Sequence, residues 1–103
     1  MTFETAAKLI KQKLTKLGYK FRTSDDCDLF YLDNYYSINL FKIEYKYKSI
    51  YYASHPKDHF WTPVYTYTFN DLKELYVIAK QHYLDVKEKK IKDKLNEINK
   101  DFQ

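Results

Sequence analysis

From Asn70 to Gln103 the chain contains neither glycine nor proline, and its apolar positions predict one long helix with two apolar faces. The first face has the i, i+3, i+4, i+7 spacing of a helix that lies on its own core; its members are Leu72, Leu75, Tyr76, Ala79, Tyr83 and Val86. The second stripe lies about a third of a turn away; its members are Val77, Leu84, Ile91, Leu95, Ile98 and Phe102. One core buries only the first stripe. The second therefore predicts contact with another copy of the chain, with a foreign partner, or with the N-terminal helix folded over it.

A second amphipathic helix is expected at the N-terminus, from about Phe3 to Leu17. Thr2 is suited to the N-cap, and Gly18 to the left-handed position that follows many helices. The apolar residues that face the core at helical spacing are Phe3, Ala6, Ala7, Ile10, Leu14 and Leu17. Leu9 lies off this stripe among lysines, and we expect it to be an isolated exposed leucine.

Between the helices, β-forming residues from Tyr19 to Phe69 predict an antiparallel meander of four or five strands. The expected strands cover residues 19–23, 29–32, 35–48, 49–53 and 64–69, with turns at 25–26 and 33–34 and a loop at 54–58. The alternation in 35–48 changes phase near Leu40, which indicates a bulge or a turn. After that point Ile43, Tyr45 and Tyr47 are expected on one aromatic face of the strand. The spacing of Thr68 and Asp71 predicts a capped start for the long helix.

These elements predict an α+β fold with an N-terminal helix, a four- or five-stranded antiparallel meander, and a long C-terminal helix. Both helices are expected on one face of the sheet. Residues 1–86 are interpreted as a single domain, and residues 87–103 as a helical C-terminal extension of it. We consider three arrangements of this extension. It associates with another chain, it folds back onto its own domain after a break near 87–90, or its helix frays. We favour association, because Ile91, Leu95 and Ile98 have the spacing of a short coiled-coil seam.

The composition narrows the class of protein without naming a function. The chain has 12 tyrosines, one cysteine and a net charge of +4. An AT-rich genome alone enriches Lys, Asn, Tyr, Phe and Ile, and the composition is similar to that of small accessory proteins of phages and mobile elements in AT-rich bacteria. The lone Cys27 and the lack of an apolar membrane-length segment favour a cytoplasmic protein without a membrane partner.

No motif for catalysis or for a cofactor is evident, so we expect a non-enzymatic protein with no catalytic residues, no metal and no cofactor. His55, Asp58 and His59 lie close in sequence, but Pro56 prevents the helical spacing that would align them on a metal. Cys27 has no local signature of a nucleophile. A single glycine excludes a glycine-rich phosphate loop.

The favoured hypothesis is a non-catalytic protein-binding module, such as a regulator, adaptor or inhibitor. It would bind a protein partner, or itself, through exposed aromatics and the C-terminal stripe. The predicted contact residues are Tyr35, Tyr45, Tyr47, Leu84, Ile91, Leu95, Ile98 and Phe102.

The alternative hypothesis is a nucleic-acid-binding protein that uses basic residues of the first helix region together with tyrosines of the sheet. The basic residues are Lys8, Lys11, Lys13, Lys16, Lys20 and Arg22. This hypothesis is weaker, because the lysines spread around the helix and a single arginine provides few bidentate contacts.

Overall fold

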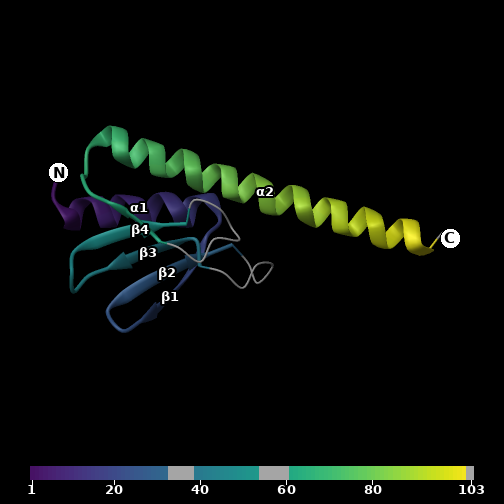
Figure 1. The fold of residues 1–103 in the computed structure, drawn as a ribbon, viewed down its shortest axis with the longest axis horizontal. Helices are drawn as coiled ribbons and strands as arrows, with labels where there is room; N and C mark the ends of the chain where they lie inside the picture. The colour runs from purple at the N-terminus through teal and green to yellow at the C-terminus, as the bar shows by residue number, and fades with distance from the viewer. Residues whose placement is uncertain (33–38, 54–60, 102–103) are drawn as a thin grey trace.

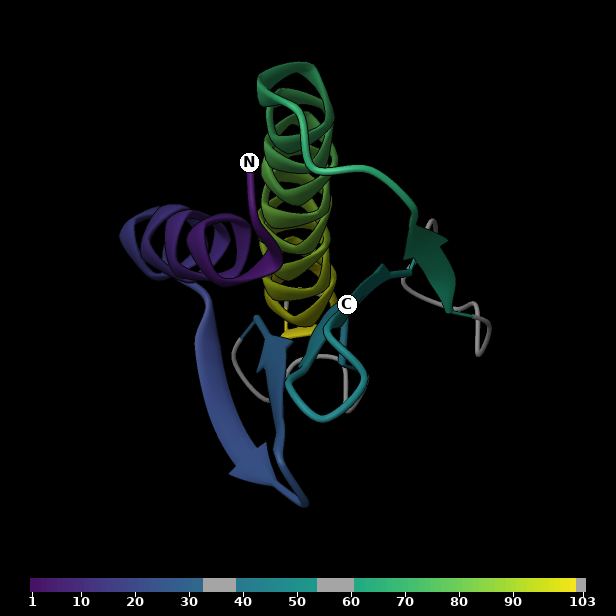
Figure 2. The same ribbon diagram turned by 90° about the vertical axis from the view of Figure 1, so that its left-hand side faces the viewer.

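The computed structural model describes residues 1–32, 39–53 and 61–101, and these form the predicted α+β fold. Helix α1 spans Phe3–Leu17, and α2 spans Phe69–Asp101. The strands between them are β1 (Lys20–Ser24), β2 (Cys27–Tyr31), β3 (Phe41–Glu44), β4 (Ser49–Tyr52) and β5 (Thr62–Val64). They form one antiparallel sheet in the order β1-β2-β3-β4-β5, and α1 and α2 lie side by side on one face of it (Figures 1 and 2). The predicted fold class is therefore confirmed.

Local side-chain chemistry explains where the helices begin and end. The hydroxyl of Thr2 accepts the backbone N–H of Thr5, and Gly18 ends α1 with a φ of 114°, as the sequence predicts. At the start of α2, the hydroxyl of Thr68 accepts the N–H of Asp71, while the Asp71 carboxylate accepts the N–H of Thr68. This reciprocal capping box fixes Phe69 as the first residue of α2.

The sheet differs from the sequence prediction in two places. The pairing of Glu44 with Ser49 closes the β3–β4 hairpin, so residues 45–48 form a turn, with Lys48 at a φ of 49°. The prediction that Tyr45 and Tyr47 continue the strand beyond Ile43 is therefore wrong. The strand expected at 64–69 is also wrong, since β5 ends at Val64 and the cap places Phe69 in α2. The turn at Asp25 and Asp26 is confirmed, because both residues have positive φ, as a two-residue hairpin requires.

The core lies between the helices and one face of the sheet. The central strands contribute Phe30, Phe41, Ile43 and Ile50, all of them fully buried. From α1 the predicted stripe of Phe3, Ala6, Ala7, Ile10 and Leu14 is buried, with Leu17 packed at its edge. Leu40 and Phe41 are buried consecutively, so the change of phase occurs where the sequence places it.

Two buried hydrogen bonds fix how α2 is seated on this core. The Tyr19 hydroxyl donates to the carbonyl of Ala79 over 2.8 Å, and burial raises the pKa of Tyr19, so this donor stays protonated. His82 Nε2 lies 2.7 Å from the carbonyl oxygen of Ala53. Because a carbonyl oxygen only accepts, Nε2 carries the proton in this bond. These bonds turn Ala79 and His82 toward the sheet.

Asp28 joins α1 to the sheet and to the β3–β4 turn. It is only 2% exposed, and its carboxylate accepts hydrogen bonds from Thr23 Oγ1 (2.7 Å), Tyr45 OH (2.6 Å) and Lys11 Nζ (3.1 Å). Burial acts to raise the pKa of Asp28, but the hydrogen bonds from Tyr45, Thr23 and Lys11 outweigh it and hold the pKa below its ordinary value. Burial, followed by the bond to Asp28, raises the pKa of Tyr45 to about 12.

We predict that Asp28→Asn lowers the free energy of unfolding at pH 7 by about 1–3 kcal/mol, because Lys11 and Tyr45 lose a charged acceptor. The carboxylate stabilises the fold above its unfolded-state pKa of about 3.9, and that stability is lost as pH falls through the lower folded-state pKa. Urea unfolding at neutral and acid pH should therefore show the difference from wild type shrinking below about pH 4. Asp25→Asn is the control, since asparagine accepts the same left-handed turn. An equal difference at both pH values would contradict this role of the carboxylate.

Among the residues of α2 whose burial the structure describes, up to Asn99, Val86 is the last that is buried, although the helix continues without a break to Asp101. A 33-residue helix is about 50 Å long, and its C-terminal half projects beyond the end of the sheet (Figure 1). The predicted alternative in which the C-terminal extension folds back onto its own domain is therefore wrong, because α2 has no break near 87–90.

The boundary between domain and extension at residue 86 stays a prediction, and truncation tests it. Ending the chain after Lys90 should change the free energy of unfolding by less than about 0.5 kcal/mol, because no residue described beyond Val86 is buried. Urea denaturation followed by circular dichroism is the measurement. A loss of more than about 2 kcal/mol would show that the extension belongs to the cooperative unit.

Candidate functional site

Three surfaces of the described chain combine apolar or aromatic groups with a defined charge: the outer face of α2, the groove between α1 and α2, and the uncovered face of the sheet. The outer face of α2 contains the second predicted stripe. We call Val77, Leu84, Ile91, Leu95 and Ile98 the outer stripe; each is between 44% and 60% exposed. Phe102, predicted to extend it, lies outside the described residues, as does Tyr35.

The outer stripe faces away from the core along the whole of α2. The buried residues in the described part of this helix are Leu75, Ala79, His82 and Val86. At about 100° per residue, the outer stripe lies about 165° around the helix from them. The first apolar face predicted from the sequence also includes Tyr76 and Tyr83. Both lie at the margins of the buried face, and Tyr76 is exposed. The separation between the two apolar faces is thus larger than the third of a turn expected from the sequence.

The outer stripe belongs to a regular heptad pattern. Together with Gln81 and Glu88, its residues step by four and three from Val77 to Ile98, which is the spacing of a coiled-coil seam. Lys80, Lys87 and Lys94 recur every seven residues along one flank. Within the seam, Glu88 is paired with Lys92 of the same helix at 3.3 Å. The seam is therefore apolar at its C-terminal end, contains two polar positions, and is bordered by positive charge.

The aromatics predicted as contact residues are not brought together with the outer stripe. The β3–β4 turn, which includes Tyr45 and Tyr47, lies at the end of the sheet away from the projecting half of α2 (Figure 1). Tyr45 contacts Phe3 at a ring distance of 6.2 Å and donates to Asp28, so it supports the fold. Tyr47 is 66% exposed and lies beside Lys46.

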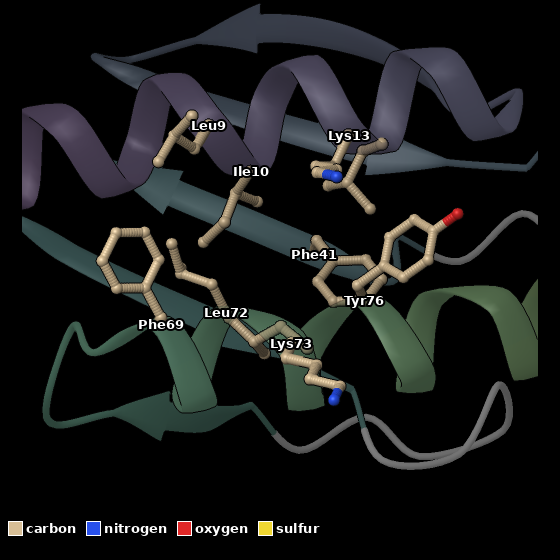
Figure 3. A pocket seen from close by; sticks show the side chains of 10 residues that line it. Leu9, Ile10, Lys13, Phe41, Phe69, Leu72, Lys73 and Tyr76 are labelled. Atoms are coloured by element: carbon tan, nitrogen blue, oxygen red, sulfur yellow. The ribbon is translucent and has the colours of Figure 1, made fainter.

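The second surface is an apolar groove of about 350 Å³ between α1 and α2. Phe41 of β3 lies at its floor, while Leu9, Ile10 and Lys13 line one wall and Phe69, Leu72, Lys73 and Tyr76 the other (Figure 3). Leu9 was expected to be an isolated exposed leucine, but it is half-buried in this wall. On α1 the sequence contained a signal for this wall in the off-stripe Leu9, whereas Leu72 and Tyr76 belong to the stripe that was predicted to face the core.

The third surface is the face of the sheet that no helix covers. The register places Arg22, Tyr31, Lys42 and Tyr51 on this open face. The Arg22 guanidinium lies 5.0 Å from the Tyr31 ring, and Lys42 Nζ lies 4.7 Å from the Tyr51 ring and 5.3 Å from that of Trp61. Cations here alternate with aromatic rings.

The basic residues of α1 do not form one surface. Lys11 is bound to Asp28, and Lys13 lies over the ring of Tyr76 at 5.5 Å in the groove. Lys8 and Lys16 are exposed on α1. Lys20 and Arg22 belong to β1 on the open face, so the predicted nucleic-acid set is divided between separate parts of the molecule.

The described residues contain no cluster of three His, Cys, Asp or Glu side chains that would hold a metal ion. His55, Asp58 and His59 lie outside them. Burial, followed by the negative charge of Glu44, raises the pKa of the Cys27 thiol, which is the opposite of what an activated nucleophile requires. None of the described helices combines the length and the apolar composition needed to cross a bilayer.

No protein-family model matches this chain, and no curated protein or solved structure matches it either. The function must therefore be argued from the three surfaces themselves.

Proposed function

We propose that this chain is a non-catalytic protein-binding module whose projecting α2 pairs with a helix of another protein. The observation that carries the proposal is the outer stripe, which gives one side of a coiled-coil seam on a helix whose opposite side packs on the core as far as Val86. Fully burying a side chain such as Leu or Ile contributes about 1.5–3 kcal/mol, so a partner helix gains from covering several of them.

The charges beside the outer stripe favour a foreign helix over a second copy of the chain. In a parallel pair of copies, the two Glu88 carboxylates would meet in the same layer of the seam. In an antiparallel pair, the flank of Lys80, Lys87 and Lys94 would lie along its own equivalent. A partner helix with acidic residues along this flank and a basic residue opposite Glu88 avoids both repulsions. The free thiol of Cys27 suits a reducing compartment, so we place this interaction in the cell interior.

A pair of synthetic helices of about four heptads tests this proposal. Both have leucine and isoleucine in the seam; one has glutamates facing the lysine flank and a lysine facing Glu88, and the other has these charges reversed. We expect the first peptide to bind the full chain about tenfold more tightly, because opposite charges meet along the seam. Fluorescence anisotropy of the labelled peptides is the measurement, and equal affinities would contradict the proposed partner chemistry.

The double variant Leu95→Asp/Ile98→Asp should weaken the first peptide by more than about thirtyfold while leaving the thermal unfolding of the domain unchanged. Lys89→Gln/Asn96→Asp is the matched control, since it makes the same change of charge away from the outer stripe. Unchanged binding by the first variant would exclude the outer stripe as the contact. Light scattering that shows a dimer of the free chain, lost in the same variant, would replace the foreign helix by a second copy.

A second candidate function is single-stranded nucleic-acid binding on the open face, favoured by the three cation–aromatic pairs found there. Such pairs resemble a stacking platform, where bases stack on rings and nearby cations contact phosphates. This version differs from the sequence-based alternative, because Lys42 of the sheet replaces the lysines of α1, whereas Arg22 and the tyrosines of the sheet are common to both.

If this second function holds, Lys42→Ala/Tyr51→Ala should weaken binding of a fluorescent oligothymidylate about tenfold, whereas Lys8→Ala/Lys16→Ala should have little effect. With about three phosphate contacts, affinity should fall about eighteenfold between 50 and 200 mM salt. Anisotropy titrations at both salt levels measure this. Binding that depends on Lys8 and Lys16 instead would return the contact to α1, and no binding at low salt would exclude the function.

A further inference from the structure

The α1–α2 groove has the size and lining of a small-molecule site. Its volume of about 350 Å³ lies within the range of ligand pockets. A cavity of about 150 Å³ accepts one benzene, so this groove accepts a ligand about twice as large. Most of the lining side chains are apolar or aromatic, and Phe69, at one end, is 80% exposed. An apolar ligand would cover surface that the chain itself leaves open to water.

The charged side chains that line the groove are all positive. They are those of Lys13 and Lys73, and no acidic side chain is present among the lining residues. The ring of Tyr76 holds Lys13 Nζ beside the apolar wall at 5.5 Å. An ammonium group in this position favours a ligand whose apolar body ends in a negative charge.

The dimensions favour a small ligand over a docked helix. The wall contributed by α2 runs from Phe69 to Tyr76, which is about 10 Å of helix. Helices shorter than about 12 residues are marginal in water, and a helix of that length extends about 18 Å. The groove is therefore shorter than the helix that would be needed to fill it.

We propose that the groove binds a medium-chain carboxylate. Its chain lies between Ile10 and Leu72 above Phe41, and its carboxylate faces Lys13, while Lys73 on the opposite wall adds positive charge (Figure 3). The outer stripe, which points away from the core, is not part of this site. The proposal for the groove is therefore independent of the proposal that α2 pairs with a partner helix.

The test is a titration of the ¹⁵N-labelled full chain with decanoate, followed by amide chemical shifts. Decanol and decyltrimethylammonium are the matched probes, since they have the same tail with a neutral and a positive head. Decanoate should shift the amides of Leu9, Lys13, Phe69 and Tyr76 with a Kd on the order of 0.1 mM. Decanol should bind about threefold more weakly, and the cation about tenfold more weakly, because only the carboxylate is attracted by the lysines.

The second arm of the test reverses the charge of the two lysines that line the groove. The variant Lys13→Glu/Lys73→Glu should weaken the binding of decanoate about tenfold or more. The control Lys16→Glu/Lys80→Glu makes the same change on the same two helices outside the groove, and it should weaken the binding less than about threefold. Amide spectra of both variants verify that the fold is retained.

Several results would overturn the proposal. They are the absence of saturable chemical-shift changes, equal affinity for the three head groups, and equal effects of the two charge reversals. Chemical-shift changes confined to the amides of residues 91–98 would also overturn it. Shifts of Leu9 and Phe69 on dilution without ligand would also overturn it, because a second copy of the chain would then occupy the groove.

Discussion

The rotation of α2 about its own axis is the constraint on which the other features depend. One sheet face has room for one apolar side of this helix, and the bonds from Tyr19 to Ala79 and from His82 to Ala53 fix which side that is. Because this side of α2 packs on the sheet, the side chains of the outer stripe have to point outward, among them Val77, Leu84 and Ile91. A helix that was polar on its outer face would complete an ordinary two-layer domain. This helix instead keeps a coiled-coil pattern there, and continues it past the last buried residue.

The same packing separates the three candidate surfaces in space and in chemistry. The outer stripe is a long apolar seam beside lysines, the groove is a short apolar cavity with two lysines in its lining, and the open face alternates cations with rings. Asp28 contributes to this division, since it engages Lys11 and Tyr45 in the interior. Binding at one surface therefore leaves the side chains of the other two accessible.

Much of the fold follows from local signals in the sequence. The caps at Thr2, Gly18 and Thr68 define three helix ends, because each satisfies backbone groups that helix ends leave without partners. The alternation in β3 puts Phe41 and Ile43 on one face of the strand, and the structure shows that this face is the buried one. The ends of the strands were harder to predict, because the residues at 45–48 are strand formers and only the cross-strand pairing makes them a turn.

The candidate sites were predictable only where they depend on a single element. The outer stripe follows from the periodicity of one helix, so the sequence indicates it directly. The groove requires the relative placement of two helices, and the burial of His82 and Asp28 requires partners far away in the sequence. Patterns along one chain do not contain that information. For this reason the expectation of an isolated, exposed Leu9 is replaced by its place in the wall of the groove.

The central claim is that α2 has two opposed apolar faces, one buried and one in water. Methyl relaxation in the presence of a soluble paramagnetic chelate measures this directly on the dilute, free chain. The account predicts strong enhancement for the methyl groups of Leu84, Ile91, Leu95 and Ile98, and weak enhancement for Leu75 and Val86. Methyl groups of the outer stripe as protected as those of Leu75 in a monomer would contradict it.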